Sequence, residues 1–302
     1  MDQFDVIIVG GGPAGLNAAV VLGRCQRKVL VFDTGRQRNQ RSKGIHNFLT
    51  RDNILPASFL QVARSELRKY GVKFINSEVT GVVQSKKKSF RVEDKKGRVW
   101  FSKKLLIATG VRDLLPDIDG FDEFYCKGVF HCPYCDGWEV RDRKIGIYSR
   151  SKNGTELALS LKTWSKHVTL FTDGKRITNT SAREMLRKNN IPVVTQRLKK
   201  LQGQNGVLKK IILADNESMP CEAIFFQAGY ESQCELLNKM GCSTTSKGIV
   251  VTNKMQQTNI YGLYVAGDVS KDVQFVIVAA AEGAKAGVAI NKDLQQEERS
   301  NS

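Results

Sequence analysis

The sequence predicts an α/β protein with two Rossmann-like dinucleotide-binding domains, the second inserted into the first. Three observations predict this class. A glycine-rich loop follows an apolar strand pattern at the start of the chain, a second set of strand and helix patterns begins near residue 144, and the first pattern returns after residue 248. The expected domains are residues 1–114 with 248–302, and the inserted segment 115–247.

The first domain opens with a strand pattern at residues 5–9. The loop Gly10-x-Gly12-x-x-Gly15 connects it to an Ala/Val/Leu-rich helix at residues 16–22. Bare backbone N–H groups and the helix dipole at such a turn point at a pyrophosphate. The next strand, residues 28–32, ends at Asp33, whose carboxylate can accept a hydrogen bond from a ribose hydroxyl. A lone glycine pattern often arises by chance, but this order of strand, loop, helix, strand and acidic residue predicts a dinucleotide site.

The remaining elements follow from apolar runs and turn residues. A strand ending in Ala108-Thr109-Gly110 precedes a turn-rich crossover at residues 116–120. Near the C-terminus, a strand ends in Gly267-Asp268 and precedes a helix expected at residues 274–290, buried at 275–281, with a frayed polar tail at 295–302. Between the crossover and this strand, the sequence predicts a helix at 156–164 and strands at 144–148, 168–171, 207–213, 223–226 and 249–251.

The most informative motif of the insert runs from His131 to Gly137 and reads His-Cys-Pro-Tyr-Cys-Asp-Gly. Cys132 and Cys135 are spaced to close a small disulfide ring, which can exchange electrons with the ring system of a bound dinucleotide. Asp136 can deliver or remove the proton that thiol exchange requires.

Two other interpretations of this motif remain open. The C-x-x-C pair could be half of a zinc site, with Cys126 and His131 as nearby further ligands. No second ligand pair follows at finger or ribbon spacing, however, and no metal is expected. A purely structural disulfide suits an oxidising compartment better than a chain with seven cysteines and no signal peptide.

Length and composition suit a two-domain enzyme. The 302 residues, 41% of them hydrophobic, can bury a core in about two domains. No apolar stretch reaches the roughly 18 to 20 residues that cross a bilayer, so no membrane span is expected. The first strand follows the N-terminal residues directly and leaves no room for a targeting segment. We therefore expect a cytoplasmic protein whose thiols are reduced except where catalysis oxidises them.

The net charge of +17, from 47 Lys and Arg against 30 Asp and Glu, raises the question of nucleic-acid binding. The basic clusters at residues 36–43, 86–88 and 199–210 lack interleaved aromatic residues on which bases could stack. A solvated basic surface, or electrostatic docking of an acidic protein, explains the charge better, and no nucleic-acid partner is expected.

Together, the glycine loop, the Ala-Thr-Gly strand end, the C-x-x-C-Asp-Gly motif and the Gly-Asp before an Ala-rich helix resemble the low-molecular-weight thioredoxin reductase family. The resemblance covers nearly the whole chain. It implies an FAD-binding first domain, a homodimer, Cys132 as the thiol that attacks substrate, Cys135 as the thiol beside the flavin, and Asp136 as general acid/base. It also implies a set of FAD-binding residues: Gly10, Gly12, Gly15, Asp33, Asn47, Gly110, Gly267, Asp268, Gln274 and Phe275.

The inserted domain departs from this family where a second glycine loop would bind NADPH. Ser149, Ser151 and Gly154 stand at its three glycine positions, and a Cβ at the second position blocks the close approach of a pyrophosphate. Asp173 stands where arginines would hold the 2′-phosphate, although it could accept from an NADH ribose hydroxyl, and Lys175-Arg176 leave a weak NADPH option. Use of NADPH is therefore doubtful.

The departures resemble two branches that work without NADPH, the ferredoxin-linked flavin thioredoxin reductases and the gliotoxin-type dithiol oxidases. Residues 44–52 and 131–139 are more similar to the oxidase-related branch. The predicted function is FAD-dependent thiol/disulfide exchange with a thioredoxin-like protein or a small dithiol or disulfide. An acidic ferredoxin is a further candidate partner. The alternatives are an ordinary NAD(P)H-dependent thioredoxin reductase, a non-catalytic flavin-binding regulatory protein, and a nucleic-acid-binding protein that kept the fold.

Overall fold

The computed structural model describes residues 3–85, 89–232, 235–246, 249–270 and 273–300. The chain forms two compact units. Unit 1 comprises Met1–Gln40, Asn47–Arg112 and Glu231–Ser302, and unit 2 comprises Arg41–His46 and Asp113–Tyr230. At two of the four places where the chain passes between the units, β7 (Val111–Asp113) and β16 (Tyr230–Ser232) pair with each other.

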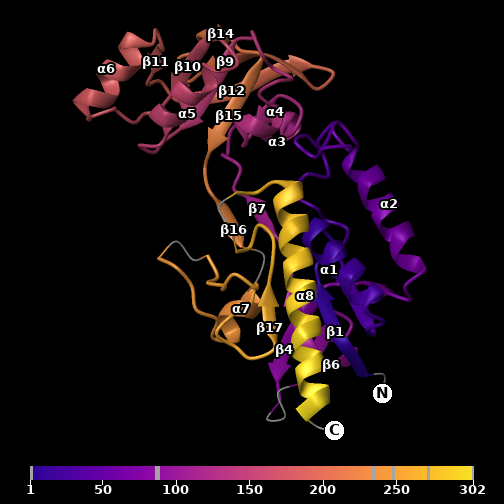
Figure 1. Ribbon diagram of the computed structural model, residues 1–302. Helices are drawn as coiled ribbons and strands as arrows, with labels where there is room; N and C mark the ends of the chain where they lie inside the picture. The colour runs from indigo at the N-terminus through magenta and orange to yellow at the C-terminus, as the bar shows by residue number, and fades with distance from the viewer. Residues whose placement is uncertain (1–2, 86–88, 233–234, 247–248, 271–272, 301–302) are drawn as a thin grey trace. The chain divides into compact units, whose positions relative to one another are not determined.

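Unit 1 is built on a seven-stranded sheet whose strands run in the order β3-β2-β1-β6-β5-β4, with β17 also paired to β6 (Figure 1). The pairs of β1 with β2 and β6 are parallel, whereas β5 pairs with β4 and β6 in the antiparallel direction. Its strands are β1 (Gln3–Val9), β2 (Val29–Asp33), β3 (Lys73–Asn76), β4 (Val79–Gln84), β5 (Phe90–Asp94), β6 (Val99–Ile107) and β17 (Leu263–Val265). Its helices are α1 (Pro13–Arg24), α2 (Pro56–Arg68), α7 (Glu235–Lys239) and α8 (Val276–Ser300).

The strands of this sheet are apolar on both faces, as expected for a sheet covered on both sides. In β1, Val6 and Ile8 face one core cluster and Ile7 faces the other. Helices α1 and α8 lie side by side in Figure 1 and contribute to the first cluster. The absence of a side chain at Gly283 lets the two helices approach closely, since a Cβ there would lie 2.0 Å from the backbone oxygen of Ala14.

Unit 2 contains a five-stranded parallel sheet, ordered β11-β10-β9-β15-β8, and a three-stranded antiparallel sheet, β12-β13-β14. One core cluster joins the five-stranded sheet to α5 and α6, and another joins it to the three-stranded sheet. The strands are β8 (Val129–Phe130), β9 (Ile145–Ser149), β10 (Val168–Phe171), β11 (Val193–Val194), β12 (Leu198–Gln204), β13 (Val207–Leu213), β14 (Ser218–Pro220) and β15 (Ala223–Gln227). The helices are α3 (Phe121–Phe124), α4 (Pro133–Asp136), α5 (Gly154–Leu161) and α6 (Thr180–Lys188).

The unit boundaries differ from the expected domain boundaries by more than two residues at two places. Residues from Glu231 onward belong to unit 1 rather than to the insert, because Leu237 of α7 is buried in the unit 1 core. Residues 41–46 belong to unit 2, where Arg41 forms an ion pair with Asp122 at 2.7 Å. Neither assignment has a signal in the apolar pattern, because both depend on long-range contacts.

Three local expectations at the C-terminal end were wrong. Helix α8 continues to Ser300 instead of fraying at 295, because Leu294 is buried and Glu297 pairs with the fully buried Lys104. The first turns of α8 are not uniformly buried, since Ile277 is 40% exposed. Residues 249–251 form only an isolated bridge, between Val250 and Thr244.

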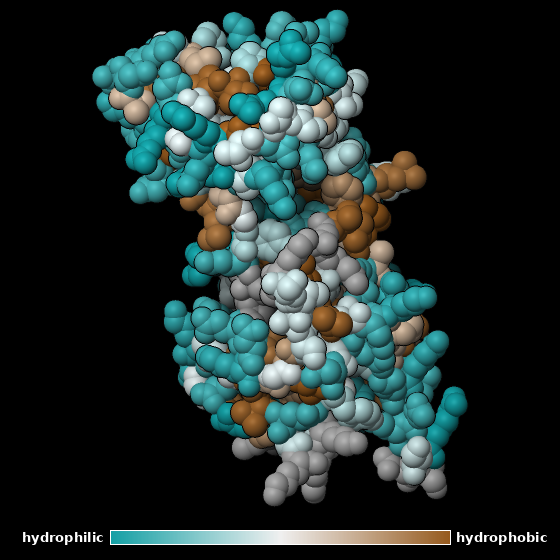
Figure 2. All heavy atoms as spheres, turned by 90° about the vertical axis from the view of Figure 1, so that its left-hand side faces the viewer, coloured by the Kyte–Doolittle hydropathy of each residue, from teal (hydrophilic) through white to brown (hydrophobic). Residues whose placement is uncertain are grey.

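The charged residues lie largely on the surface. On the face drawn in Figure 2, hydrophilic side chains predominate over both units. Within the part of the chain that the structure describes, no helix combines the length and apolar character needed to cross a membrane.

Candidate functional site

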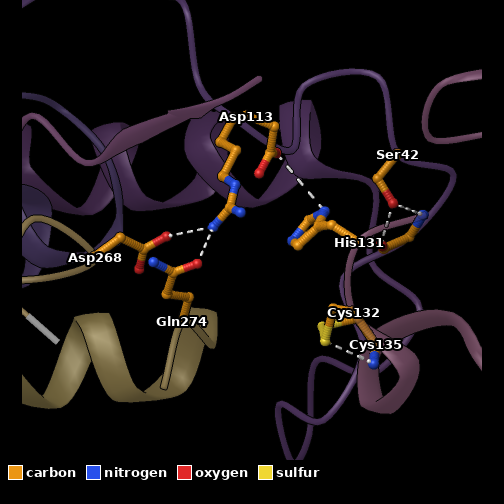
Figure 3. Close-up of a disulfide and its surroundings, with 9 residues drawn as sticks. Ser42, Asp113, His131, Cys132, Cys135, Asp268 and Gln274 are labelled. Carbon is orange, nitrogen blue, oxygen red and sulfur yellow. Dashed lines mark hydrogen bonds and ion pairs between the residues drawn. A yellow bond between two sulfur atoms is a disulfide. The ribbon is translucent and has the colours of Figure 1, made fainter. Parts of the chain in front are cut away.

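Cys132 and Cys135 form a disulfide in unit 2, with their Cα atoms 5.3 Å apart (Figure 3). Cys132 is the N-cap of the short helix α4, and its Sγ accepts a hydrogen bond from the backbone N–H of Cys135 at 3.1 Å. Pro133 occupies the first helical position, where a missing N–H costs no hydrogen bond. The predicted redox pair is therefore positioned by one helical turn. Because the two sulfurs are bonded to each other, they do not act as zinc ligands in this state.

Asp136, the last residue of α4, is the titratable group of this turn. Burial raises the pKa of its carboxyl to about 7, and the negative charge of Glu139 adds to the increase. A carboxyl with a pKa near neutrality can both accept and donate a proton at physiological pH. This is the property that the sequence assigned to Asp136.

Two charged pairs lie near this turn in unit 2. His131, which precedes Cys132, points toward Asp113 in Figure 3, with its Nδ1 3.7 Å from the carboxylate, and the Tyr125 hydroxyl donates to the same carboxylate. The Nε2 of His46 lies 3.6 Å from a carboxylate oxygen of Glu139. Asp113, His46 and Glu139 were not predicted from the sequence, because pairs of residues far apart in sequence carry no local pattern.

The glycines of the first loop, in unit 1, have different roles. A Cβ at Gly10 would lie 2.1 Å from the Ala108 carbonyl oxygen, and one at Gly15 would lie 1.9 Å from that of Gly10, so both glycines are required by the turn itself. A Cβ at Gly12 meets no protein atom within 4 Å. The space beside Gly12 is open at the N-terminus of α1, as a pyrophosphate site requires.

Asp33 ends β2, as predicted, and a second residue not foreseen from the sequence contacts it. The guanidinium of Arg64, from α2, donates to Asp33, and Gln37 donates to it at 3.2 Å. Among the described residues, Nε of Arg64 is a buried nitrogen without a hydrogen-bond partner. At the predicted ribose-binding position, Asp33 is therefore paired with Arg64.

A second polar group in unit 1 surrounds Asp268. The Arg38 guanidinium donates to both Gln274 and Asp268, and its nitrogen is 3.3 Å from the Asp268 carboxylate; Figure 3 labels these two partners. Gln274 Nε2 and Thr109 Oγ1 are buried without a hydrogen-bond partner among the described residues. Buried polar groups are rarely left unpaired in native proteins, so these atoms fit a polar ligand.

The other predicted FAD residues also lie in unit 1. Gly110 and Gly267 have φ of 68° and 86°, which favours glycine, and the Gly267 N–H donates to buried Glu282 at 2.8 Å. Phe275 directly precedes α8 and is half-buried. Asn47 is exposed, and its backbone N–H donates to Asp52 at 2.9 Å. The structure brings Arg38, Asp268 and Gln274 into contact.

The degenerate loop after β9, in unit 2, is closed by its own side chains. The Oγ of Ser149 accepts from the Ser151 N–H, and the Oγ of Ser151 accepts from the Asn153 N–H, both at 3.3 Å. Ser149 is buried, and a Cβ at Gly154 would lie 2.8 Å from its Cβ. Two N–H groups of this loop thus already have partners.

Asp173, at the end of β10, is similarly occupied. It accepts from the Tyr148 hydroxyl at 3.0 Å and from the Leu198 N–H at 3.1 Å, and Arg150 lies 3.8 Å away. Its side chain is only 14% exposed. The carboxylate therefore holds β9, β10 and β12 together.

Comparison with known proteins identifies related chains. The family model described as "Pyridine nucleotide-disulphide oxidoreductase" matches residues 4–283. A probable thioredoxin reductase from Arthroderma benhamiae is 30% identical, over 98% of this chain and 81% of its own length. The thioredoxin reductase sirT from Leptosphaeria maculans is 29% identical, over 95% of this chain and 93% of its own.

Solved structures show the same architecture. HlmI has a TM-score of 0.96 at 32% identity, covering 99% of this chain and 95% of that one. The putative thioredoxin reductase TrxB of Bacillus anthracis has a TM-score of 0.93 at 31% identity, covering 98% and 99%. These similarities confirm the predicted α/β fold class with two dinucleotide-binding domains and the resemblance on which the sequence analysis relied.

Proposed function

We propose, from the premise that this chain belongs to the pyridine nucleotide-disulphide oxidoreductase family, that it transfers electrons between FAD and an external dithiol or disulfide with little use of NADPH. The family membership confirms the predicted enzyme class, a flavin-dependent disulfide oxidoreductase similar to thioredoxin reductase. The observation that carries the proposal is the Cys132–Cys135 disulfide followed directly by Asp136, whose pKa is about 7.

The family implies FAD, and the residues of unit 1 fit it. Gly12 leaves open space at a helix N-terminus, where a pyrophosphate binds favourably. Asp33 with Arg64, and Asp268 with Arg38 and Gln274, supply polar groups, two of whose buried nitrogens, Arg64 Nε and Gln274 Nε2, have no hydrogen-bond partner within the described part of the chain. When bound, FAD supplies a two-electron acceptor and donor.

The exchange at the cysteines is a thiol–disulfide reaction. In the oxidising direction, one substrate thiol transfers its proton to Asp136 and attacks Cys132 Sγ, which forms a mixed disulfide and releases Cys135 as a thiolate. The second substrate thiol attacks the substrate sulfur of that mixed disulfide and releases Cys132, whose sulfur takes up the proton of the attacking thiol, while Asp136 returns the first proton to the Cys135 thiolate. The substrate becomes a disulfide, and the enzyme disulfide gains two electrons and becomes a dithiol. The reverse sequence reduces a disulfide substrate.

The closed loop of unit 2 supports poor use of NADPH. The N–H groups of Ser151 and Asn153 already bond to serine hydroxyls, and a pyrophosphate would have to displace these bonds. Asp173 repels a 2′-phosphate, and its bonds to Tyr148 and Leu198 also occupy the oxygens that an NADH ribose would use. Lys175 and Arg176 are the remaining basic residues of the expected phosphate position.

Anaerobic titration of the purified protein tests the proposal. We expect bound FAD, fast bleaching of its absorbance by dithiothreitol, and slow bleaching by NADPH and NADH. Rapid and complete bleaching by micromolar NADPH would indicate an ordinary NADPH-dependent thioredoxin reductase. A protein that neither contains nor takes up FAD contradicts the proposal altogether.

Variants test the two sulfurs separately. Cys135→Ser should accumulate a mixed disulfide between Cys132 and a disulfide substrate, detectable by mass spectrometry, because Cys132 attacks the substrate disulfide and no second enzyme thiol resolves the product. Cys132→Ser should accumulate none, and Cys25→Ser, at an exposed free cysteine, should behave as wild type. Trapping in Cys132→Ser instead of Cys135→Ser would reverse the assigned roles.

The partner and the assembly follow from the same family. A thioredoxin-like protein or a small dithiol is the substrate class that we propose, an acidic ferredoxin suits the net charge of +17 as a donor, and we propose a cytoplasmic homodimer. Gel filtration with light scattering at several protein concentrations tests the dimer, and a monomer at all of them contradicts it.

A further inference from the structure

We propose that His46 is a positioning residue that acts through Glu139 to control proton exchange at Asp136. The inference rests on the proposed function, because it assumes that Asp136 exchanges protons with the thiols. It adds to that function a residue far from the cysteines in sequence, on a segment with no strand or helix of its own.

The geometry joins His46 to unit 2. His46 ends the segment 41–46, whose other end is held by the ion pair of Arg41 with Asp122 at 2.7 Å and by the Arg41 guanidinium over the Tyr125 ring at 5.5 Å. The Nε2 of His46 is 3.6 Å from Glu139 Oε1, and the His46 side chain is only 15% exposed. The imidazole is thus held beside Glu139.

The electrostatics connect Glu139 to Asp136. The negative charge of Glu139 raises the pKa of Asp136, in addition to the effect of burial. Nε2 of His46 faces the Glu139 carboxylate at 3.6 Å, and a ring N–H or positive charge there offsets part of the effect of Glu139 on Asp136. Removing His46 should therefore make Asp136 harder to ionise, and removing the Glu139 charge should make it easier.

Other titratable groups face the same region and must be separated from His46. The pKa of the Cys126 thiol is raised to about 11, mainly by burial and also by the charges of Asp136 and Asp113, although the hydrogen bond with Tyr125 and the charge of Arg41 act in the opposite direction. Cys126 therefore stays protonated at neutral pH. His131 pairs with Asp113 at 3.7 Å and is the other histidine of this region.

The test is the pH dependence of reduction of the oxidised holoenzyme by dithiothreitol, from about pH 5.5 to about pH 9. Each variant's rate is divided by the wild-type rate at the same pH, which cancels the ionisation of dithiothreitol. His46→Gln should be about two- to fivefold slower than wild type near pH 6 and equal to it near pH 9. Glu139→Gln should be faster near pH 6 by about the same factor.

The double variant His46→Gln/Glu139→Gln should match Glu139→Gln alone, because His46 is proposed to act only through Glu139. His167→Gln, at an exposed histidine outside the region, is the matched control and should give a flat ratio. His131→Gln tests the neighbouring pair and should leave the His46 effect unchanged.

A flat ratio for His46→Gln, or an undiminished effect of His46→Gln in the Glu139→Gln background, overturns the inference. Asp136→Asn distinguishes this failure from failure of the proposed function. If Asp136→Asn slows reduction about 10²-fold while His46→Gln is flat, only the inference fails. If Asp136→Asn reduces at the wild-type rate, the acid/base role itself is wrong.

Discussion

The loops at residues 10–15 and 149–154 both follow a buried parallel strand and precede a helix, yet they differ in what satisfies their backbone. In the first, a Cβ at Gly12 would have no atom of the described residues within 4 Å. In the second, the hydroxyls of Ser149 and Ser151 bond to the N–H groups of the loop. The strand–loop–helix arrangement of a nucleotide-binding site can therefore be kept for its packing, while serine hydroxyls accept the hydrogen bonds that a pyrophosphate would accept.

The largest expected effect is at the open loop. Gly12→Val should lower bound FAD at least about tenfold, because the side chain enters the space where the pyrophosphate binds. Gly12 has an extended backbone, with φ of −82°, and its Cβ meets no protein atom, so the melting temperature of the apoprotein should stay near that of the wild-type apoprotein. The flavin absorbance per protein and the melting temperature measure the two effects.

Gly15→Ala is the matched control within the same loop. Its Cβ would lie 1.9 Å from the Gly10 carbonyl oxygen, so this variant should lose thermal stability together with FAD. Equal loss of stability in both variants would mean that the Gly12 position is structural and that the comparison of the two loops is wrong.

A smaller effect is expected when the closed loop is opened. Ser149→Gly/Ser151→Gly removes the hydroxyls and frees backbone N–H groups, each worth about 1 kcal/mol in a hydrogen bond. NADH binding should tighten by about five- to tenfold, and NADPH binding by less, because Asp173 still repels the 2′-phosphate. Fluorescence titration measures both affinities, and a larger gain for NADPH than for NADH would contradict the proposed role of Asp173.

The smallest expected effect is a change in the pH dependence of stability, caused by the Asp136 carboxyl of unit 2. The pKa of Asp136 is raised from 3.8 to about 7 in the folded protein, so between these values the folded state holds a proton that the unfolded state has lost. Stability contributed by this proton is therefore lost as the pH rises through this window. Asp136→Asn cannot ionise at this position. Its melting temperature minus that of wild type should therefore be a few degrees larger at about pH 8 than at about pH 5. A difference that does not change with pH would show that Asp136 ionises as readily in the folded protein as in the unfolded one.

Local patterns predicted the parts of the molecule that depend on neighbours in sequence. The strand, loop and helix at residues 3–24, the strand ending at Asp33 and the redox turn at Cys132 each follow from a short run of residues. The contacts of Arg38 with Asp268, of Arg64 with Asp33 and of His46 with Glu139 join residues that are distant in sequence. Such pairs depend on how strands cross over, and no periodicity reports them. The C-terminal turns of α8 were missed for the same reason, because the partner of Glu297 is a buried lysine in β6.

The discontinuity of unit 1 has a consequence for the order of events at the ribosome. All of unit 2 has been synthesised once Tyr230 has been made, whereas β17, Asp268 and α8 all follow residue 262. Domains fold as units during synthesis, so unit 2 can form while the sheet of unit 1 still lacks a strand and one covering helix. During this interval the core cluster that contains Val6 and Ile8 lacks the side chains of α8, and the apolar surface that α8 later covers is available to chaperones. Flavin uptake must then be a late event, because the last of its predicted contacts leaves the ribosome with the final part of the chain.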